Sequence, residues 1–166
     1  MGLLANYMMV GDDELDSLKA LAGDDLVERI EELDEGEAPV YDLDKMWDLL
    51  HFTLTGVSAS APVEGNPLSE AVVGAHVFDT EDFIGCTKTD ELSGIIAALE
   101  KFDWTSRRAD FTAGKIRKAK LYPDLAESTP ADYDNLWKTM TDEFHGLLAF
   151  YRQAAQAKKH VIVSIY

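Results

Sequence analysis

The chain has 166 residues, of which 46% are hydrophobic, and its formal net charge is -16 at pH 7. This length and apolar content are enough for a folded domain with its own core, which excludes a disordered acidic tail. The single cysteine, Cys86, excludes an intrachain disulfide and a cysteine-based zinc site. No apolar run reaches the roughly 20 residues that cross a bilayer, so we expect a cytoplasmic protein with no membrane partner.

The first half of the chain predicts a strand, then helices, then a loop. Helices are expected where a capping residue, such as Asp12 or Asp24, precedes apolar residues that recur three and four positions apart. The strand is rich in β-prone side chains, and the loop is rich in Gly, Ser and Pro. In chain order, the strand covers 5–10, the helices cover 12–21, 24–33 and 44–54, and the loop covers 56–67.

The second half predicts a long helix before a final strand. Apolar residues keep helical spacing from Tyr133 to Ala155, and the tail after His160 is apolar at successive positions, which is typical of a central strand. The expected elements are a strand over 71–78 that Gly74 interrupts, helices over 89–99 and 132–157, a short helix within the basic segment 101–120, and a strand over 160–166. We therefore predict a single α+β domain over 1–166, with a small mixed sheet packed against several helices, including one long C-terminal helix.

The charge is distributed unevenly. Residues 1–50 hold 15 acidic and 3 basic residues, 51–100 hold 8 and 1, and 101–166 hold 8 and 11. Such a field repels nucleic acid and favours cationic partners, although surface carboxylates also serve solubility alone. We expect no nucleic-acid partner, and we expect the bases between 101 and 120 to pair with the acidic N-terminal half.

The helix over 44–54 carries the residues most suited to chemistry. Asp44, Asp48 and His51 are spaced by four and three, which places them near one helix face, where they could bind a metal or move a proton. Three residues on one helix are too few for a metal site. The alternative is that Asp44 caps the helix, Asp48 is solvated and His51 makes a structural hydrogen bond. We predict no metal and no cofactor.

Ser69 follows the loop and is a candidate nucleophile if His51 lies nearby. No Gly-x-Ser-x-Gly motif surrounds it, and a serine near the start of an element is more often a cap. The candidate pocket consists of Trp47, His51, Asn66, Ser69 and Tyr122, with His51 as the acid or base.

Several segments together resemble a known family. They are LDKMWDLLHFTLTG at 43–56, PLSEAVVG at 67–74, LYP at 121–123 and FYRQAA at 150–155. In this order and spacing they resemble the YfbM-like bacterial family, a domain of unknown function (1877). The resemblance implies a single α+β domain and carries over no activity, substrate or catalytic residue.

Competing functions follow from these observations. The absence of a complete catalytic motif and the acidic N-terminal half favour a non-catalytic interaction protein that binds a basic partner, for example an inhibitor or immunity-like protein. The alternative is a small-molecule-binding protein or hydrolase-like enzyme that uses the pocket around His51 and Ser69. Self-association through the long helix or an edge strand is a third interpretation.

Overall fold

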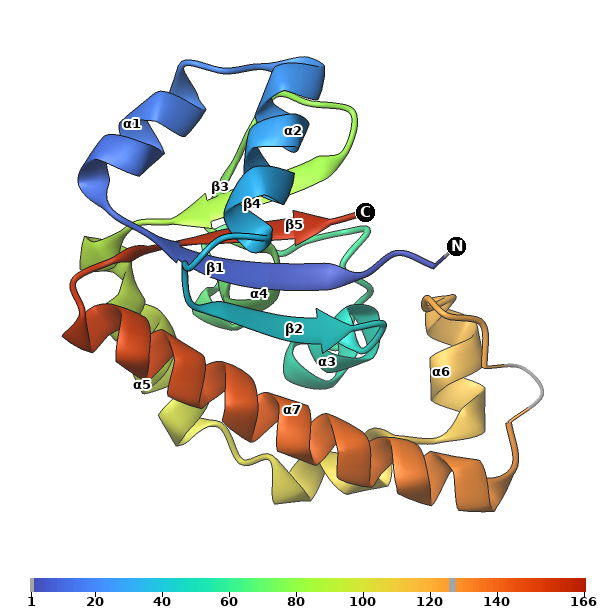
Figure 1. Cartoon of the computed structure of the whole chain (residues 1–166). Coiled ribbons are helices and arrows are strands. Elements are labelled where there is room, and N and C mark those ends of the chain that lie inside the picture. The colour runs from blue at the N-terminus through green and yellow to red at the C-terminus, as the bar shows by residue number, and fades with distance from the viewer. Residues whose placement is uncertain (1, 126–127) are drawn as a thin grey trace.

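The computed structural model describes residues 2–125 and 128–166, and Figure 1 shows its elements around one sheet. In chain order they are β1 (Ala5–Val10), α1 (Asp12–Lys19), α2 (Gly23–Asp34), β2 (Val40–Asp44), α3 (Trp47–Thr55), α4 (Pro67–Val73), β3 (His76–Val77), β4 (Phe83–Thr87), the short 3-10 helix η1 (Thr89–Glu91), α5 (Leu92–Lys101), a second 3-10 helix η2 (Thr105–Asp110), α6 (Ala113–Ala119), α7 (Pro130–Gln156) and β5 (His160–Ile165).

The sheet is antiparallel throughout the described strands. Its order is β2-β1-β5-β4-β3, and β5 pairs with β1 on one side and with β4 on the other. The helices between β4 and β5 return the chain to the end of the sheet where β4 stops, so β5 runs back beside it. The α+β class and the central final strand are confirmed, whereas the predicted mixed sheet is corrected to an antiparallel one.

Both faces of the sheet are covered, because successive residues of a strand point to opposite sides. Met8, Val10 and Ile162 pack beneath α1 and α2 in one apolar cluster. Tyr7 and Val163, their neighbours in β1 and β5, pack into the larger core formed with α3, α4, α5 and α7. Figure 1 shows the resulting layers, with α1 and α2 on one face of the sheet and α7 on the other.

The long helix α7 packs inward, as its periodicity predicts. It begins with a capping box, in which the Asp132 carboxylate accepts from the backbone N–H of Thr129 at 2.7 Å and the Thr129 hydroxyl accepts from the backbone N–H of Asp132 at 3.3 Å. Pro130 occupies its first turn. Its buried residues are Tyr133, Met140, Phe144, Leu147, Leu148, Phe150, Tyr151 and Ala154. This apolar face forms one wall of the larger core.

The predicted strand over 71–78 is wrong for most of its length. Asn66 caps a helix instead, accepting a hydrogen bond from the backbone N–H of Leu68 at 2.9 Å, and Pro67 fits the first turn. The helix ends at Val73, and Gly74 caps its C-terminus with a φ of 84°, which is accessible to glycine without steric cost. Only residues 76–77 form a strand, so capping chemistry overrides the β propensity of the valines.

The edge strand β2 and the inner strand β4 were not predicted. β4 contains Gly85, where a side chain would begin only 2.3 Å from the carbonyl oxygen of Val73 in α4. The glycine therefore permits the close approach of helix and sheet while weakening the strand signal in the sequence.

Candidate functional site

The helix α3 places a carboxylate inside the protein. Asp48 is 2% exposed and accepts hydrogen bonds from the backbone N–H of Ala59 and from that of Tyr122, each at 2.7 Å. The Ser58 hydroxyl lies 2.9 Å from one Asp48 oxygen and 3.1 Å from the other. Asp48 thus joins α3 to the α3–α4 loop and to the segment after α6, and the expectation that it is solvated is wrong.

His51 and Ser69 meet, as the hydrolase-like alternative requires. The Nε2 atom of His51 lies 2.7 Å from the Ser69 hydroxyl oxygen, and Nδ1 lies 2.8 Å from the Val57 carbonyl oxygen. Because a carbonyl only accepts, Nδ1 carries the proton and Ser69 donates to Nε2. The Ser69 oxygen also accepts from the backbone N–H of Val63 at 3.0 Å.

The burial of His51 and Ser69 argues against a catalytic role for the pair in this conformation. His51 is 0% exposed and Ser69 is 1% exposed, so a substrate in solution reaches neither group in this conformation. Every hydrogen bond described above for the pair ties α3, the α3–α4 loop and α4 together. In this conformation the pair therefore has a structural role, because its hydrogen bonds hold the α3–α4 loop against α3 and α4.

The protonation of His51 gives a testable pH dependence. Burial lowers its pKa below the ordinary value, although the bond to Val57 and the charge of Asp48 oppose this shift. In the unfolded chain the histidine titrates near pH 6.5. The contribution of neutral His51 to the free energy of unfolding is therefore complete above about pH 6.5, and it is lost as the pH falls toward the lower pKa of the folded state. The loss approaches about 1.4 kcal/mol per pH unit for one group.

We expect urea unfolding to show a steeper loss of stability between about pH 6.5 and 5.5 in the natural protein than in a His51→Gln variant. Titratable groups that both proteins share contribute equally to the two slopes and cancel in this comparison. Equal slopes would show that His51 is not kept neutral by folding.

The remaining candidate residues also have structural contacts. Trp47 stacks on Tyr122 with ring centroids 5.6 Å apart, and its indole N–H donates to the Leu3 carbonyl at 3.1 Å. The Tyr122 hydroxyl accepts from the backbone N–H of Leu3 at 2.8 Å. Trp47 and Tyr122 thus hold the segment before β1, and Asn66 caps α4. Asp48 is bonded to the backbone of Tyr122 and lies on the same helix as Trp47 and His51. A functional role for the five candidate residues stays a prediction.

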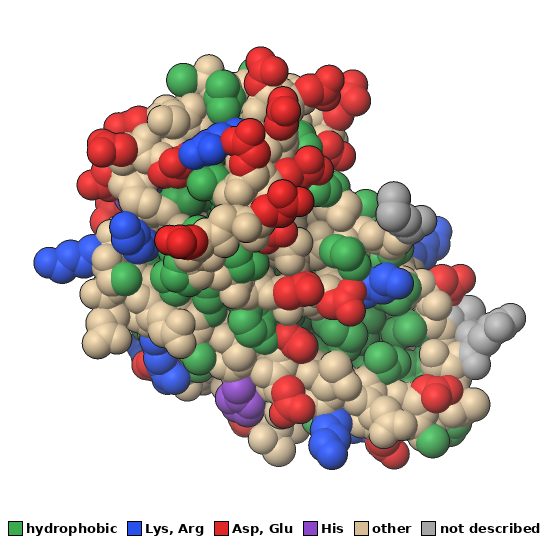
Figure 2. Space-filling model, viewed as in Figure 1, with side chains coloured by type: hydrophobic (Ala, Val, Ile, Leu, Met, Phe, Trp, Pro, Cys, Tyr) green, Lys and Arg blue, Asp and Glu red, His purple; other side chains and the backbone are tan. Residues whose placement is uncertain are grey.

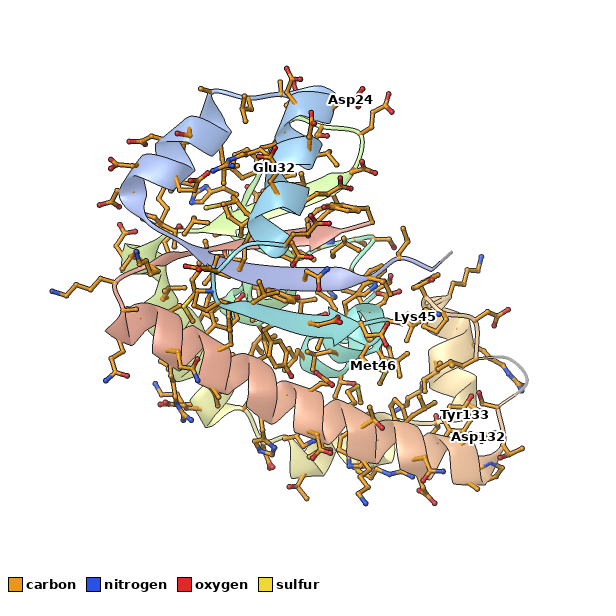
Figure 3. All side chains as sticks on the ribbon, viewed as in Figure 1. Asp24, Glu32, Lys45, Met46, Asp132 and Tyr133 are labelled. Atoms are coloured by element: carbon orange, nitrogen blue, oxygen red, sulfur yellow. The ribbon has the colours of Figure 1, made fainter. Side chains whose placement is uncertain are left out.

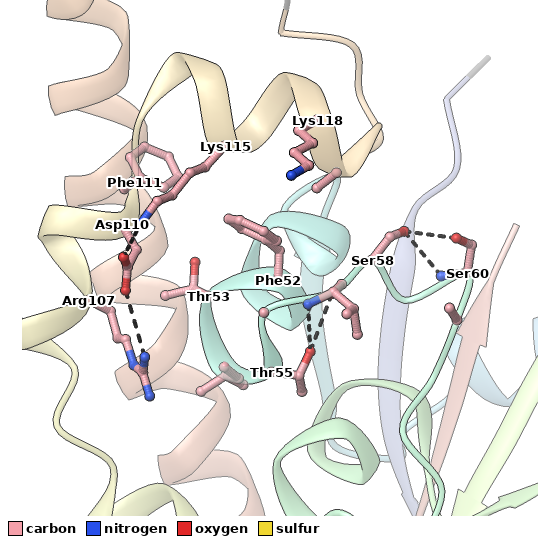
Figure 4. Close-up of a pocket in the computed structure, with 15 residues that line it drawn as sticks. Phe52, Thr53, Thr55, Ser58, Ser60, Arg107, Asp110, Phe111, Lys115 and Lys118 are labelled. Atoms are coloured by element: carbon pink, nitrogen blue, oxygen red, sulfur yellow. Dashed lines mark hydrogen bonds and ion pairs between the residues drawn. The ribbon is translucent and has the colours of Figure 1, made fainter.

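A separate cleft lies beside this network, between the end of α3 with the following loop and the η2–α6 segment (Figure 4). It has a volume of about 690 Å³, and none of the five candidate residues lines it. Its walls combine aromatic, hydroxyl and charged side chains, among them Phe52, Thr55, Ser58, Asp110, Phe111, Lys115 and Lys118. The basic composition of 101–120 was the only sequence signal for it, because its walls come from segments distant in the chain.

The basic segment does not neutralise the acidic half in the way predicted. Arg107 and Lys115 pair with Asp110, and Arg108 pairs with Asp134. For these three residues the predicted pairing with the N-terminal half is wrong. Their partners lie in η2 and α7, and α6 stands at the opposite end of the molecule from α1 and α2 (Figure 1).

Carboxylates gather over α1, α2 and the turn that follows (Figure 2). Figure 3 shows Asp24 at the start of α2, pointing away from the sheet. We call this surface the acidic face; its exposed members are Asp12, Asp13, Asp16, Asp24, Asp25, Glu28, Glu31, Glu32, Asp34, Glu35 and Glu37. The basic residues of this stretch are Lys19 and Arg29, and Arg29 pairs with Glu14 and Glu32. Asp12 also pairs with His160. Among the residues of 2–125 and 128–166, the other exposed carboxylates of the acidic face make no ion pair with a basic side chain.

Cys86 is not a reactive thiol in this fold. It is buried, and burial raises its pKa to about 11, so the thiolate is scarce at neutral pH. Across 2–125 and 128–166, no group of three His, Cys, Asp or Glu side chains is arranged to hold a metal ion. Over the same residues, no helix is both long enough and apolar enough to cross a membrane.

These features define a class, an α+β protein in which helices cover both faces of one antiparallel sheet and a buried polar network fastens the α3–α4 loop. Residues 1–164 match the model of the "Domain of unknown function (DUF1877)" family, and the chain belongs to this family. The resemblance inferred from the sequence is thereby confirmed.

Two comparisons support the assignment over the full length. The chain is 28% identical to Protein YfbM of Escherichia coli (strain K12) over 167 residues, which cover 99% of each chain. It is also similar to the crystal structure of YfbM from Escherichia coli, a protein of unknown function, with a TM-score of 0.84 at 26% identity, covering 98% of this chain and 99% of the other.

Proposed function

We propose that the protein is a non-catalytic interaction module that binds a cationic protein through its acidic face, in the manner of an inhibitor or immunity-like protein. The observation that carries this proposal is the lack of internal compensation, because Arg107, Arg108 and Lys115 pair with Asp110 and Asp134 rather than with the acidic face. Uncompensated charge of one sign accelerates encounter with a partner of opposite charge and selects against anionic partners.

Tyr166 supports a defined contact point at one border of this face. Partial burial and the charge of Glu31 raise the pKa of its phenol, the hydrogen bond with Ser164 opposes this shift, and the charges of Asp34 and Asp82 add to it. The ring therefore lies within the field of carboxylates from both α2 and the β3–β4 connection. An aromatic ring beside carboxylates suits a Lys or Arg side chain of the partner, through ion pairing and cation–π contact.

The hydrolase-like alternative has one supporting observation, the hydrogen bond from Ser69 to His51 in the tautomer that activates a nucleophile. The burial of both side chains favours the interaction function over it. A hydrolase would first have to open the α3–α4 loop and break the bonds that His51 makes there.

The test is capture of cytoplasmic proteins from the native host on three immobilised proteins. These are the natural chain, a Glu31→Lys/Asp34→Lys variant, and a Glu64→Lys/Asp142→Lys control with the same change in net charge. Lysines near the C-terminal end of α2 suit the helix dipole, so the first variant is expected to fold.

We expect a basic protein to bind the natural chain and the control, and to bind the α2 variant at least about tenfold more weakly. Equal loss of binding from both variants would show a dependence on net charge alone and would overturn a defined face. Retention by all three proteins, or by none, would also overturn it.

A further inference from the structure

We propose that the cleft between α3 and α6 binds a small organic anion, a phosphate, sulfonate or carboxylate group joined to an apolar body. This site is distinct from the acidic face and does not depend on the proposed protein partner. The cleft volume of about 690 Å³ lies within the usual range for small-molecule sites.

The cations of the cleft exceed its carboxylates. Asp110 pairs with both Arg107 and Lys115, so one carboxylate is shared by two cations. Lys118 also lines the cleft and makes no ion pair with any residue of 2–125 or 128–166. In a chain with a net charge of -16, this local excess of positive charge is contrary to the overall composition.

The two lysines are directed by the helix that carries them. Lys115 and Lys118 are three residues apart on α6, which places them on the same side of the helix. Figure 4 shows the Lys118 ammonium pointing toward Phe52 across the cleft, while Lys115 bends toward Asp110. An anionic group between α6 and Phe52 would therefore meet the Lys118 ammonium first.

The hydroxyl groups of the cleft are already used by the protein. Ser60 donates to Ser58 at 3.0 Å, Ser58 donates to Asp48, and the Thr55 hydroxyl donates to the His51 carbonyl at 2.8 Å. Charge on the lysines, rather than a ring of hydroxyl donors, would thus recognise the anion. Ammonium groups act as point charges without a fixed geometry, so phosphate, sulfonate and carboxylate groups all suit the site.

An apolar wall completes the site. Phe111 and Leu54 are buried beneath the cleft, and the partly buried ring of Phe52 lines it from α3. An apolar or aromatic body can cover the exposed part of the Phe52 ring and gain its burial. A bare inorganic anion would gain only the contact with the lysines.

The test is titration of the isotope-labelled full chain with 2-naphthyl phosphate, 2-naphthoate, neutral 2-naphthol and inorganic phosphate, followed by NMR. We expect both naphthyl anions to shift amide signals of residues 52–61 and 107–119 in a saturable way, each binding at least about tenfold more tightly than 2-naphthol or phosphate. The two naphthyl anions together distinguish a preference for phosphate from one for carboxylate.

Matched variants localise the effect. Lys118→Gln is expected to weaken binding of the naphthyl anions about tenfold, whereas Lys138→Gln, which removes an exposed charge from α7, is expected to leave it unchanged. Equal binding of 2-naphthol and the anions, shifts elsewhere in the chain, or equal weakening by both variants would overturn the proposal.

Discussion

Replacement of Asp48 by alanine is expected to lower the free energy of unfolding by about 3–5 kcal/mol, because each buried donor left without a partner costs about 1–3 kcal/mol. The donors that lose their acceptor are the N–H groups of Ala59 and Tyr122 and the hydroxyl of Ser58. This loss is a large part of the roughly 5–15 kcal/mol that stabilises a domain. Urea unfolding followed by tryptophan fluorescence measures it.

Two further substitutions sharpen the Asp48 prediction. Asp48→Asn keeps one oxygen acceptor but turns an NH₂ group toward one of the donors, so most of the loss should remain. Asp16→Ala removes an exposed carboxylate from α1 and should change stability by no more than about 0.5 kcal/mol. A loss below about 1 kcal/mol in Asp48→Ala would show that the buried carboxylate does not hold the two loops.

Phe144 is the second residue whose removal should have a large effect. Its ring stacks on Trp104 with centroids 4.5 Å apart and lies 6.2 Å from the ring of Phe102, which joins α7 to the segment between α5 and η2. Phe144→Ala should cost about 3–5 kcal/mol, through lost burial and the cavity that remains. Thermal or urea unfolding measures the loss, and the fluorescence of the folded state should change because Trp104 loses its neighbour.

A size series provides the control for Phe144. Phe144→Leu keeps most of the volume and should cost less than the alanine variant, and Gln153→Ala on the exposed side of α7 should stay within about 0.5 kcal/mol of the natural protein. If alanine and leucine at 144 were equally tolerated, the aromatic stack would not be part of the stabilising core.

The elements with strong periodicity were predictable, and those defined by tertiary contacts were not. The α7 stripe and the tail strand could be identified because their apolar patterns are long and regular. Val72 and Val73 carry β-prone side chains but continue the helix capped by Asn66, and β4 contains Gly85 because α4 passes close to it. Pairing direction depends on how the intervening helices return the chain, so the antiparallel sheet was not predictable from strand patterns. That 1–166 forms one domain stays a prediction.

The candidate site was predictable in part. The proximity of His51 and Ser69 was inferred as a condition for catalysis, and the structure meets it, but exposure could not be read from spacing. Asp48 looked like a solvated residue because the donors from Ala59 and Tyr122 come from segments 11 and 74 residues away. The same reason explains the missed cleft, whose walls from α3 and α6 meet only after folding.

The proposed interaction depends on the acidic face remaining available to a partner, and the ionic-strength dependence of association tests it most directly. Surface plasmon resonance with the captured partner, from about 50 to about 500 mM salt, compares the natural chain with the Glu31→Lys/Asp34→Lys variant. We predict an association rate that falls steeply with salt for the natural chain and less steeply for the variant. Association rates independent of salt, or equal salt slopes for the two proteins, would contradict binding through the acidic face.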